Sequence, residues 1–187
     1  RDRADGSFFT AADDKLLIAS GADPIIPDIP GVSLGGVFTV RTPDDAAAIR
    51  SYIQTAQCKK AVVVGAGFIG MEMAENLTAQ GLSVTVIDMA DQILPGILDP
   101  EMAGFAAREL RKGGLRLLTG TLLSAIKGEQ SVSSVVTGAG ELEADIVILS
   151  IGIRPATAFL ANSGIELVRG AVAVDEHQQT NLPNVYA

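Results

Sequence analysis

The chain has 187 residues and a formal net charge of −8, because 22 acidic side chains outnumber 14 lysines and arginines. This length suits about one domain, and 48% apolar with 19% charged residues is typical of a globular protein and excludes general disorder. The negative charge disfavours nucleic acid and anionic membranes as partners, and no apolar run reaches the ~18 residues of a membrane span.

The single cysteine, Cys58, and the single histidine, His177, limit the chemistry that the chain can carry. One cysteine excludes an intrachain disulfide framework, and a metal site built from histidine and cysteine would lack ligands. We therefore predict no metal site and a cytoplasmic location. The chain begins at Arg1 without the pattern of a signal peptide, and we expect it to be a piece of a longer protein.

The first part of the chain predicts short elements separated by turns. An apolar run at 15–20 predicts a buried strand, residues 22–36 are rich in Pro and Gly and predict a loop, and 37–40 suit a short strand. A helix should then begin at Thr42-Pro43-Asp44-Asp45 and extend to about Thr55, since threonine can cap, proline suits the first helical position and acids favour the first turn.

Strands and helices alternate in the next part of the chain. We predict buried strands at 61–64, 83–87 and 115–118, a helix from Phe68 to about Gln80, and a helix from Asp99-Pro100 to the glycines at 113 and 114. The strand at 61–64 lacks polar alternation, which is typical of parallel strands covered on both faces. This order predicts an α/β fold, a Rossmann-like open parallel sheet with helices on it.

The pattern changes after residue 120. Residues 121–127, 131–137 and 141–144 are more polar and are separated by turn residues, and they predict an antiparallel meander. Residues 145–151 return to the buried-strand pattern, and we expect a short helix at 155–162 and one more strand at 171–174.

The motif that carries chemistry is the G-x-G-x-x-G sequence from Gly65 to Gly70, between a predicted strand and a predicted helix. In a dinucleotide site Gly65 would allow the tight turn, Gly67 would let a pyrophosphate approach the backbone, and Gly70 would let the helix pack closely on the strand. Free N–H groups at the helix start would bind the phosphates. The alternative is an ordinary glycine-rich turn between a strand and a helix.

Asp88 ends the next strand, close to the ~20 positions after the motif at which an acid contacts the ribose of NAD. Its carboxylate could accept hydrogen bonds from both ribose hydroxyls. No arginine stands between 89 and 98 to receive a 2′-phosphate, so we predict that NAD(H) is preferred over NADP(H).

Several segments together resemble the flavin-dependent pyridine nucleotide–disulfide oxidoreductases. They follow the family's order and cover most of the chain: DKLLIASGADP (14–24), IPG (29–31), VVVGAGFIGMEMAENL (62–77), VTVIDMADQILPGILDPEM (84–102), ADIVILSIGIRP (144–155) and VDEHQQTNLPNVYA (174–187). Within the family, the segment MEMAENL resembles the corresponding sequence in the branch of coenzyme A-disulfide reductases, NADH oxidases and NADH peroxidases.

The resemblance implies a divided architecture. Residues 1–36 and 156–187 would be returning segments of an FAD domain, and 37–155 the NAD(P)H-binding domain. The rest of the FAD site, the redox cysteine and the domain that makes the parent a homodimer would lie outside the chain. No catalytic residue is therefore expected here.

The resemblance also implies roles for individual residues. Phe68 would lie near the nicotinamide and the flavin; the alternative is that it only packs against the start of the helix. Glu72 would lie near the nicotinamide; the alternative is that it is an ordinary solvated residue of the helix. The strand end at 151–153 would support the nicotinamide half. The full cofactor-binding set that we predict is Gly65, Ala66, Gly67, Phe68, Ile69, Gly70, Glu72, Asp88, Met89, Ile151, Gly152, Ile153, Ser20 and Gly21.

The implied function is that of a parent enzyme passing hydride from NADH to FAD and on to a disulfide such as coenzyme A disulfide, a peroxide or oxygen. The chain alone should bind nucleotide and catalyse nothing. Two alternatives remain, an electron transferase of the ferredoxin- or rubredoxin-reductase type, and a nucleotide-sensing module without a redox step.

Overall fold

The computed structural model describes residues 5–7 and 13–187. The chain divides into two units, one formed by residues 1–23 with 154–187 and the other by 24–153. The sequence analysis predicts cofactor domains with limits after residues 36 and 155, and that assignment stays a prediction. In the structure Ile29, Val32 and Leu34 pack on the core of the second unit.

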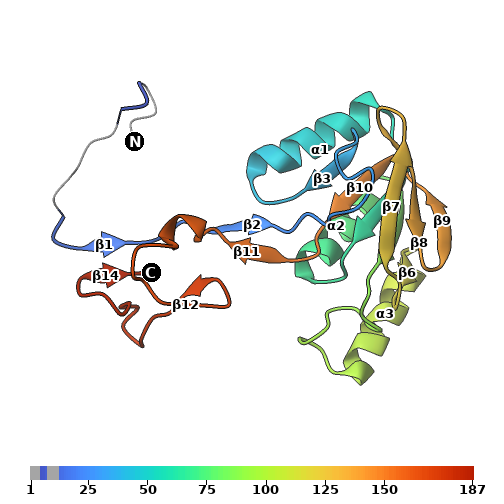
Figure 1. Cartoon of the computed structure of the whole chain (residues 1–187). Helices are drawn as coiled ribbons and strands as arrows, with labels where there is room; N and C mark the ends of the chain where they lie inside the picture. The colour runs from blue at the N-terminus through green and yellow to red at the C-terminus, as the bar shows by residue number, and fades with distance from the viewer. Residues whose placement is uncertain (1–4, 8–12) are drawn as a thin grey trace. The chain divides into compact units, whose positions relative to one another are not determined.

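A five-stranded parallel sheet is the centre of the second unit (Figure 1). Its order is β3-β10-β4-β5-β6, with β3 at Val37–Thr39, β10 at Ile146–Leu149, β4 at Lys60–Val64, β5 at Ser83–Ile87 and β6 at Arg116–Leu118. Strand β10 enters between β3 and β4, so a segment from late in the chain lies beside the strand that leads into the glycine motif. The predicted parallel sheet is confirmed.

The three predicted helices form where the residues that start and stop helices predict them. They are α1 at Pro43–Thr55, α2 at Phe68–Ala79 and α3 at Pro100–Lys112. Thr42 and Asp45 close a capping box at the start of α1, and the carboxylate of Asp99 accepts the Met102 N–H at 2.8 Å. Backbone N–H donors hold the pKa of Asp45 below its ordinary value. Gly67 caps α2 without a side chain, which leaves the start of that helix open.

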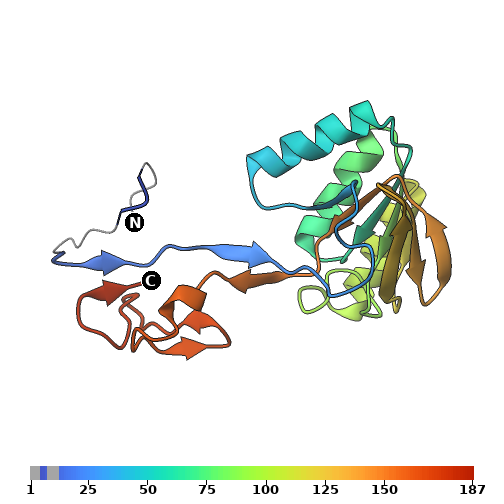
Figure 2. The same cartoon turned by 45° about the horizontal axis from the view of Figure 1, so that its top comes forward.

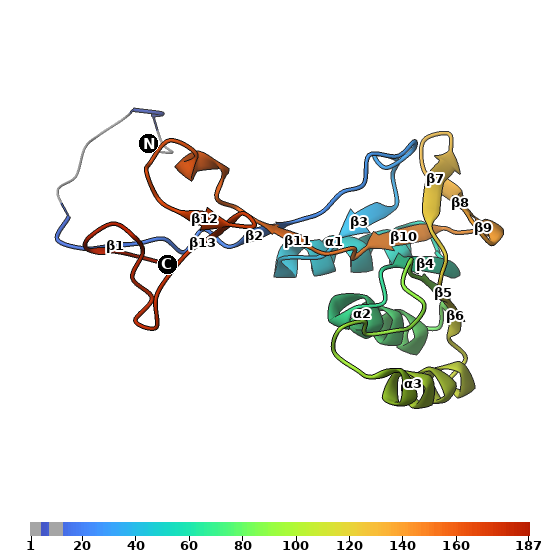
Figure 3. The same cartoon turned by 60° about the horizontal axis from the view of Figure 1, so that its bottom comes forward.

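The unit is built in three layers. Alternate residues of the strands pack against the helices through a core that includes Ile53, Leu77 and Ala103. The opposite face packs against an antiparallel meander made of β7 (Leu123–Gly128), β8 (Val132–Thr137) and β9 (Gly140–Glu143), which confirms the predicted change of pattern. Figures 2 and 3 show the helices on one side of the sheet and the meander on the other.

Gly31 joins the 25–36 segment to the meander. It has φ of +82°, and a Cβ added there would overlap the backbone carbonyl of Ile126. The Ile126 N–H donates to the Pro30 carbonyl at 2.8 Å, so the close approach is held by a hydrogen bond.

We expect Gly31→Ala to lower the free energy of unfolding by about 2–4 kcal/mol, because it adds left-handed backbone strain to an overlap that only backbone movement can relieve. Urea denaturation measures the change. Gly138→Ala is the matched control, since a Cβ at Gly138 meets nothing within 4 Å. Equal stabilities for the two variants would contradict this account of Gly31.

The first unit has only short elements in its described part. Strand β1 (Leu16–Leu17) pairs in parallel with β14 (Val185–Tyr186), and β12 (Leu167–Val168) pairs with β13 (Ala171–Val172). Strands β2 (Ala22–Pro24) and β11 (Ile153–Pro155) form a further two-stranded sheet.

Two predictions for this unit were wrong. The run at 15–20 was predicted to be a buried strand, but β1 has two residues and Leu16 and Leu17 are 48% and 68% exposed, since the pair β1-β14 forms a sheet of only two strands. The predicted helix at 155–162 is a single 3-10 turn, η1 (Ala158–Leu160), because Pro155 ends strand β11 instead of starting a helix. The strand predicted at 171–174 is limited to the two residues of β13.

Candidate nucleotide-binding site

The glycine turn after β4 is closely packed on its protein side. Gly65 has φ of +107°, and a Cβ there would overlap the backbone of Ser150. A Cβ on Gly70 would overlap the carbonyl oxygen of Gly65 and lie 2.7 Å from the Ser150 Oγ. These two positions need glycine because the start of α2 lies directly against the ends of β4 and β10.

Gly67 is glycine for a different reason. Its φ of −77° suits any residue, and a Cβ built on it meets nothing within 4 Å. The first helical hydrogen bond runs from the Met71 N–H to the Gly67 carbonyl at 2.9 Å, so the N–H groups of residues 67–70 have no acceptor within the helix. Open space beside free N–H groups at the positive end of a helix is the arrangement that binds phosphate.

Asp88 is joined to this turn by backbone hydrogen bonds. Its Oδ2 accepts the Ala66 N–H at 2.6 Å, and its Oδ1 accepts the Ala90 N–H at 2.7 Å. The Ala66 carbonyl in turn accepts the Leu94 N–H at 2.8 Å. The carboxylate is half-buried, and it is held beside the glycine turn with lone pairs left for further donors.

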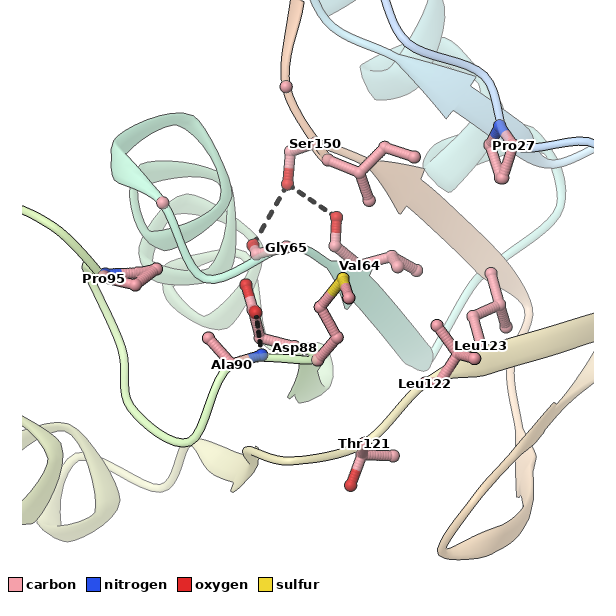
Figure 4. A pocket seen from close by; sticks show the side chains of 14 residues that line it. Pro27, Val64, Gly65, Asp88, Ala90, Pro95, Thr121, Leu122, Leu123 and Ser150 are labelled. Atoms are coloured by element: carbon pink, nitrogen blue, oxygen red, sulfur yellow. Dashed lines mark hydrogen bonds between the residues drawn. The ribbon is translucent and has the colours of Figure 1, made fainter.

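A pocket of about 520 Å³ opens at the carboxyl ends of the strands (Figure 4). The ends of β4, β5 and β10 contribute to it, as does the segment after β6. Ligands of open parallel sheets bind at this edge, at the point where the connections diverge to either side. The lining residues are Pro27, Val64, Gly65, Gly67, Asp88, Met89, Ala90, Pro95, Thr121, Leu122, Leu123, Ser150, Ile151 and Gly152.

The structure brings together six of the predicted residues in the pocket wall: Gly65, Gly67, Asp88, Met89, Ile151 and Gly152. Ala66 and Gly70 are buried in the turn behind them. Phe68 and Ile69 are 60% and 46% exposed at the start of α2, Glu72 is exposed one turn further along, and Ile153 is 61% exposed beyond the wall. Ser20 and Gly21 belong to the first unit, and their part in a site stays a prediction.

The sequence reasoning missed other residues of the wall. Pro27, Thr121 and Leu122 belong to connections without a motif, and Leu123 is the first residue of β7. Ser150 was also missed, although the rule that ligands lie beyond the carboxyl ends of strands could have found it, since it directly follows β10. Among the residues that the structure describes, no cluster of His, Cys, Asp or Glu could hold a metal ion, and no helix is long and apolar enough to cross a bilayer.

Comparison with known proteins identifies relatives of the whole chain. Residues 1–187 match the family described as pyridine nucleotide-disulphide oxidoreductase. The NADH oxidase of Methanocaldococcus jannaschii is 42% identical over 98% of this chain and 41% of its own length. The NAD(P)H coenzyme A polysulfide/persulfide reductase of Pyrococcus horikoshii is 42% identical over 93% of this chain and 39% of its own length. The chain thus spans about two fifths of these relatives.

A solved structure shares the fold. It is an engineered water-forming NADPH oxidase bound to NADPH, a mutant of the NADH oxidase of Lactobacillus brevis. Its TM-score is 0.89 at 26% identity, and the match covers 98% of this chain and 40% of that one. The α/β fold and the resemblance stated from the sequence are confirmed.

Proposed function

The chain belongs to the pyridine nucleotide-disulphide oxidoreductases, which depend on FAD and NAD(P)H, and we propose that residues 24–153 hold the nicotinamide dinucleotide of a longer flavoprotein. The observation that carries the proposal is the pairing of an open Gly67 with the Asp88 carboxylate, both on the wall of one pocket. The bound dinucleotide supplies a hydride, and this unit supplies its placement.

The chain's residues suit the parts of a dinucleotide. The free N–H groups at the start of α2 would receive the pyrophosphate, in the space that Gly67 leaves open. Asp88 would accept the hydroxyls of the adenosine ribose on the β5 side. The nicotinamide half would then extend to the opposite side of β4, toward Ile151 and Gly152 at the end of β10.

NADH is the proposed cofactor in preference to NADPH. A 2′-phosphate on the ribose would meet the Asp88 carboxylate, and residues 89–98 contain no lysine or arginine to balance it. The engineered NADPH-bound oxidase supports this proposal. It replaces a glycine, an aspartate and a proline at the spacing of Gly70, Asp88 and Pro95, and it introduces an arginine directly after the aspartate position.

The parent protein would pass the hydride from NADH to FAD and on to a disulfide, a persulfide, a peroxide or oxygen. The names of the relatives, an NADH oxidase and a coenzyme A polysulfide/persulfide reductase, support acceptors of this kind. We further propose that the first unit, residues 1–23 with 154–187, contributes to the parent's FAD domain and that the parent is a homodimer.

The test is anaerobic mixing of the full-length parent with NADH while the visible absorbance of the flavin is followed. We expect the spectrum of the oxidised flavin to be lost at a much lower concentration of NADH than of NADPH. The isolated chain should leave NADH unoxidised. A parent that contains flavin and is not reduced by either nucleotide would overturn the proposed function.

A further inference from the structure

The Ser150 hydroxyl joins two parts of the pocket wall that come from distant parts of the chain. Its Oγ lies 2.9 Å from the Val64 carbonyl oxygen and 3.1 Å from that of Gly65 (Figure 4). The Ser150 N–H also donates to the Val64 carbonyl, at 2.8 Å. One residue at the end of β10 is therefore bonded to the start of the glycine turn by both its backbone and its side chain.

The glycine turn has further anchors that do not depend on Ser150. The Gly65 N–H donates to the Ile87 carbonyl at 2.8 Å, the Ala66 N–H to Asp88, and the Leu94 N–H to the Ala66 carbonyl. These bonds fasten the turn to β5 and to the loop after it. Loss of the Ser150 hydroxyl would thus leave the turn in place.

The end of β10 is held differently. Beyond Ser150, the Gly152 carbonyl accepts the Ile25 N–H at 3.0 Å, while Ile151 is 38% exposed and Gly152 has φ of +118°. Without the hydroxyl, one side-chain anchor of this strand end is lost, and the segment that continues into Ile151 and Gly152 gains freedom.

The Ser150 hydroxyl also fills the space left by the missing side chain of Gly70. The Ser150 Oγ lies 2.7 Å from where a Cβ of Gly70 would stand, so the side chain occupies the gap left by a bare Cα at the start of α2. The side chain contacts β4 and α2 at their junction, and its position is set by both.

We propose that Ser150 is a positioning residue that fixes the end of β10 relative to the glycine turn, and so sets the nicotinamide half of the cofactor against the pyrophosphate. The proposal rests on the proposed function, and it adds a residue to the site. If the end of β10 had to become ordered when the cofactor binds, this cost would reduce the affinity for ligands that contain the nicotinamide half. ADP-ribose lacks nicotinamide and does not need the end of β10, so its affinity would not be reduced.

The experiment compares NADH and ADP-ribose as ligands of the wild-type chain and of Ser150→Ala by calorimetry. We expect Ser150→Ala to weaken NADH binding about three- to tenfold, the effect of one hydrogen bond, and ADP-ribose binding less than about twofold. Ser133→Ala is the control, since it removes a serine hydroxyl from the meander at a position outside the pocket wall. Ser150→Cys, whose larger thiol keeps only a weak donor, should lie between wild type and alanine.

The outcomes separate this inference from the proposed function. Equal losses for NADH and ADP-ribose, or no loss for either, would overturn the role of Ser150 while leaving the site in place. A folded wild-type chain that binds neither ligand would overturn the proposed function itself. Thermal unfolding of each variant checks that the comparison is made between folded proteins.

Discussion

Replacing Gly67 by valine should strongly weaken NADH binding while leaving the chain folded. A side chain at Gly67 meets no protein atom within 4 Å, and its φ of −77° needs no glycine. The valine would instead fill the space beside the N–H groups that are proposed to receive the pyrophosphate. We expect the affinity for NADH to fall at least about a hundredfold, and the free energy of unfolding to fall by about 1 kcal/mol or less, since valine is a poorer helix cap than glycine.

The fluorescence of NADH during titration measures the binding, and urea denaturation measures the stability. Gly138→Val is the matched control, because Gly138 also has open space but lies in the turn between β8 and β9. It should bind NADH as the wild type does. If the Gly67 variant retained wild-type affinity, the phosphate site would have to lie elsewhere.

Replacing Asp88 by alanine should remove the preference for NADH. Hydrogen bonds to a charged acceptor are worth about 1.5–3 kcal/mol, so we expect NADH affinity to fall about ten- to a hundredfold. NADPH loses no such contact and is freed from repulsion between its phosphate and the carboxylate. The ratio of the two affinities should therefore change by at least about tenfold.

The ratio is the informative quantity for this variant because Asp88 also holds the backbone of Ala66 and Ala90. Loosening that backbone would lower the affinities for NADH and NADPH by similar factors, so this effect would cancel in the ratio of the two affinities. Asp91→Ala is the control, since it removes one acidic charge from the same loop at an exposed position outside the pocket wall. An unchanged ratio in the Asp88 variant would show that the carboxylate does not contact the ribose.

The centre of the fold could be predicted from the sequence because its signals are local. A buried strand, a glycine turn, a helix and an acid at the next strand end follow one another within residues 61–88, so each element limits the next. The cap at Thr42 and the change to an antiparallel meander after residue 120 follow from local patterns in the same way, and both are confirmed.

The rest depended on contacts between distant segments. Ser150 reaches the glycine turn only because β10 pairs with β4, and Thr121 reaches the pocket through the connection after β6. The prediction of a buried strand at 15–20 was wrong because a local pattern was not matched by contacts with other segments. An apolar run indicates a buried strand, but Leu16 and Leu17 belong to a sheet of two strands that leaves them exposed.

The most direct test of the proposed site is the change in backbone amide chemical shifts when NADH is added to the isotope-labelled chain. We predict saturable changes concentrated at residues 65–72, 88–95 and 150–152, with the amides at the start of α2 most affected. Changes centred on other parts of a folded chain, or none at saturating NADH, would contradict the assignment of this pocket to the dinucleotide.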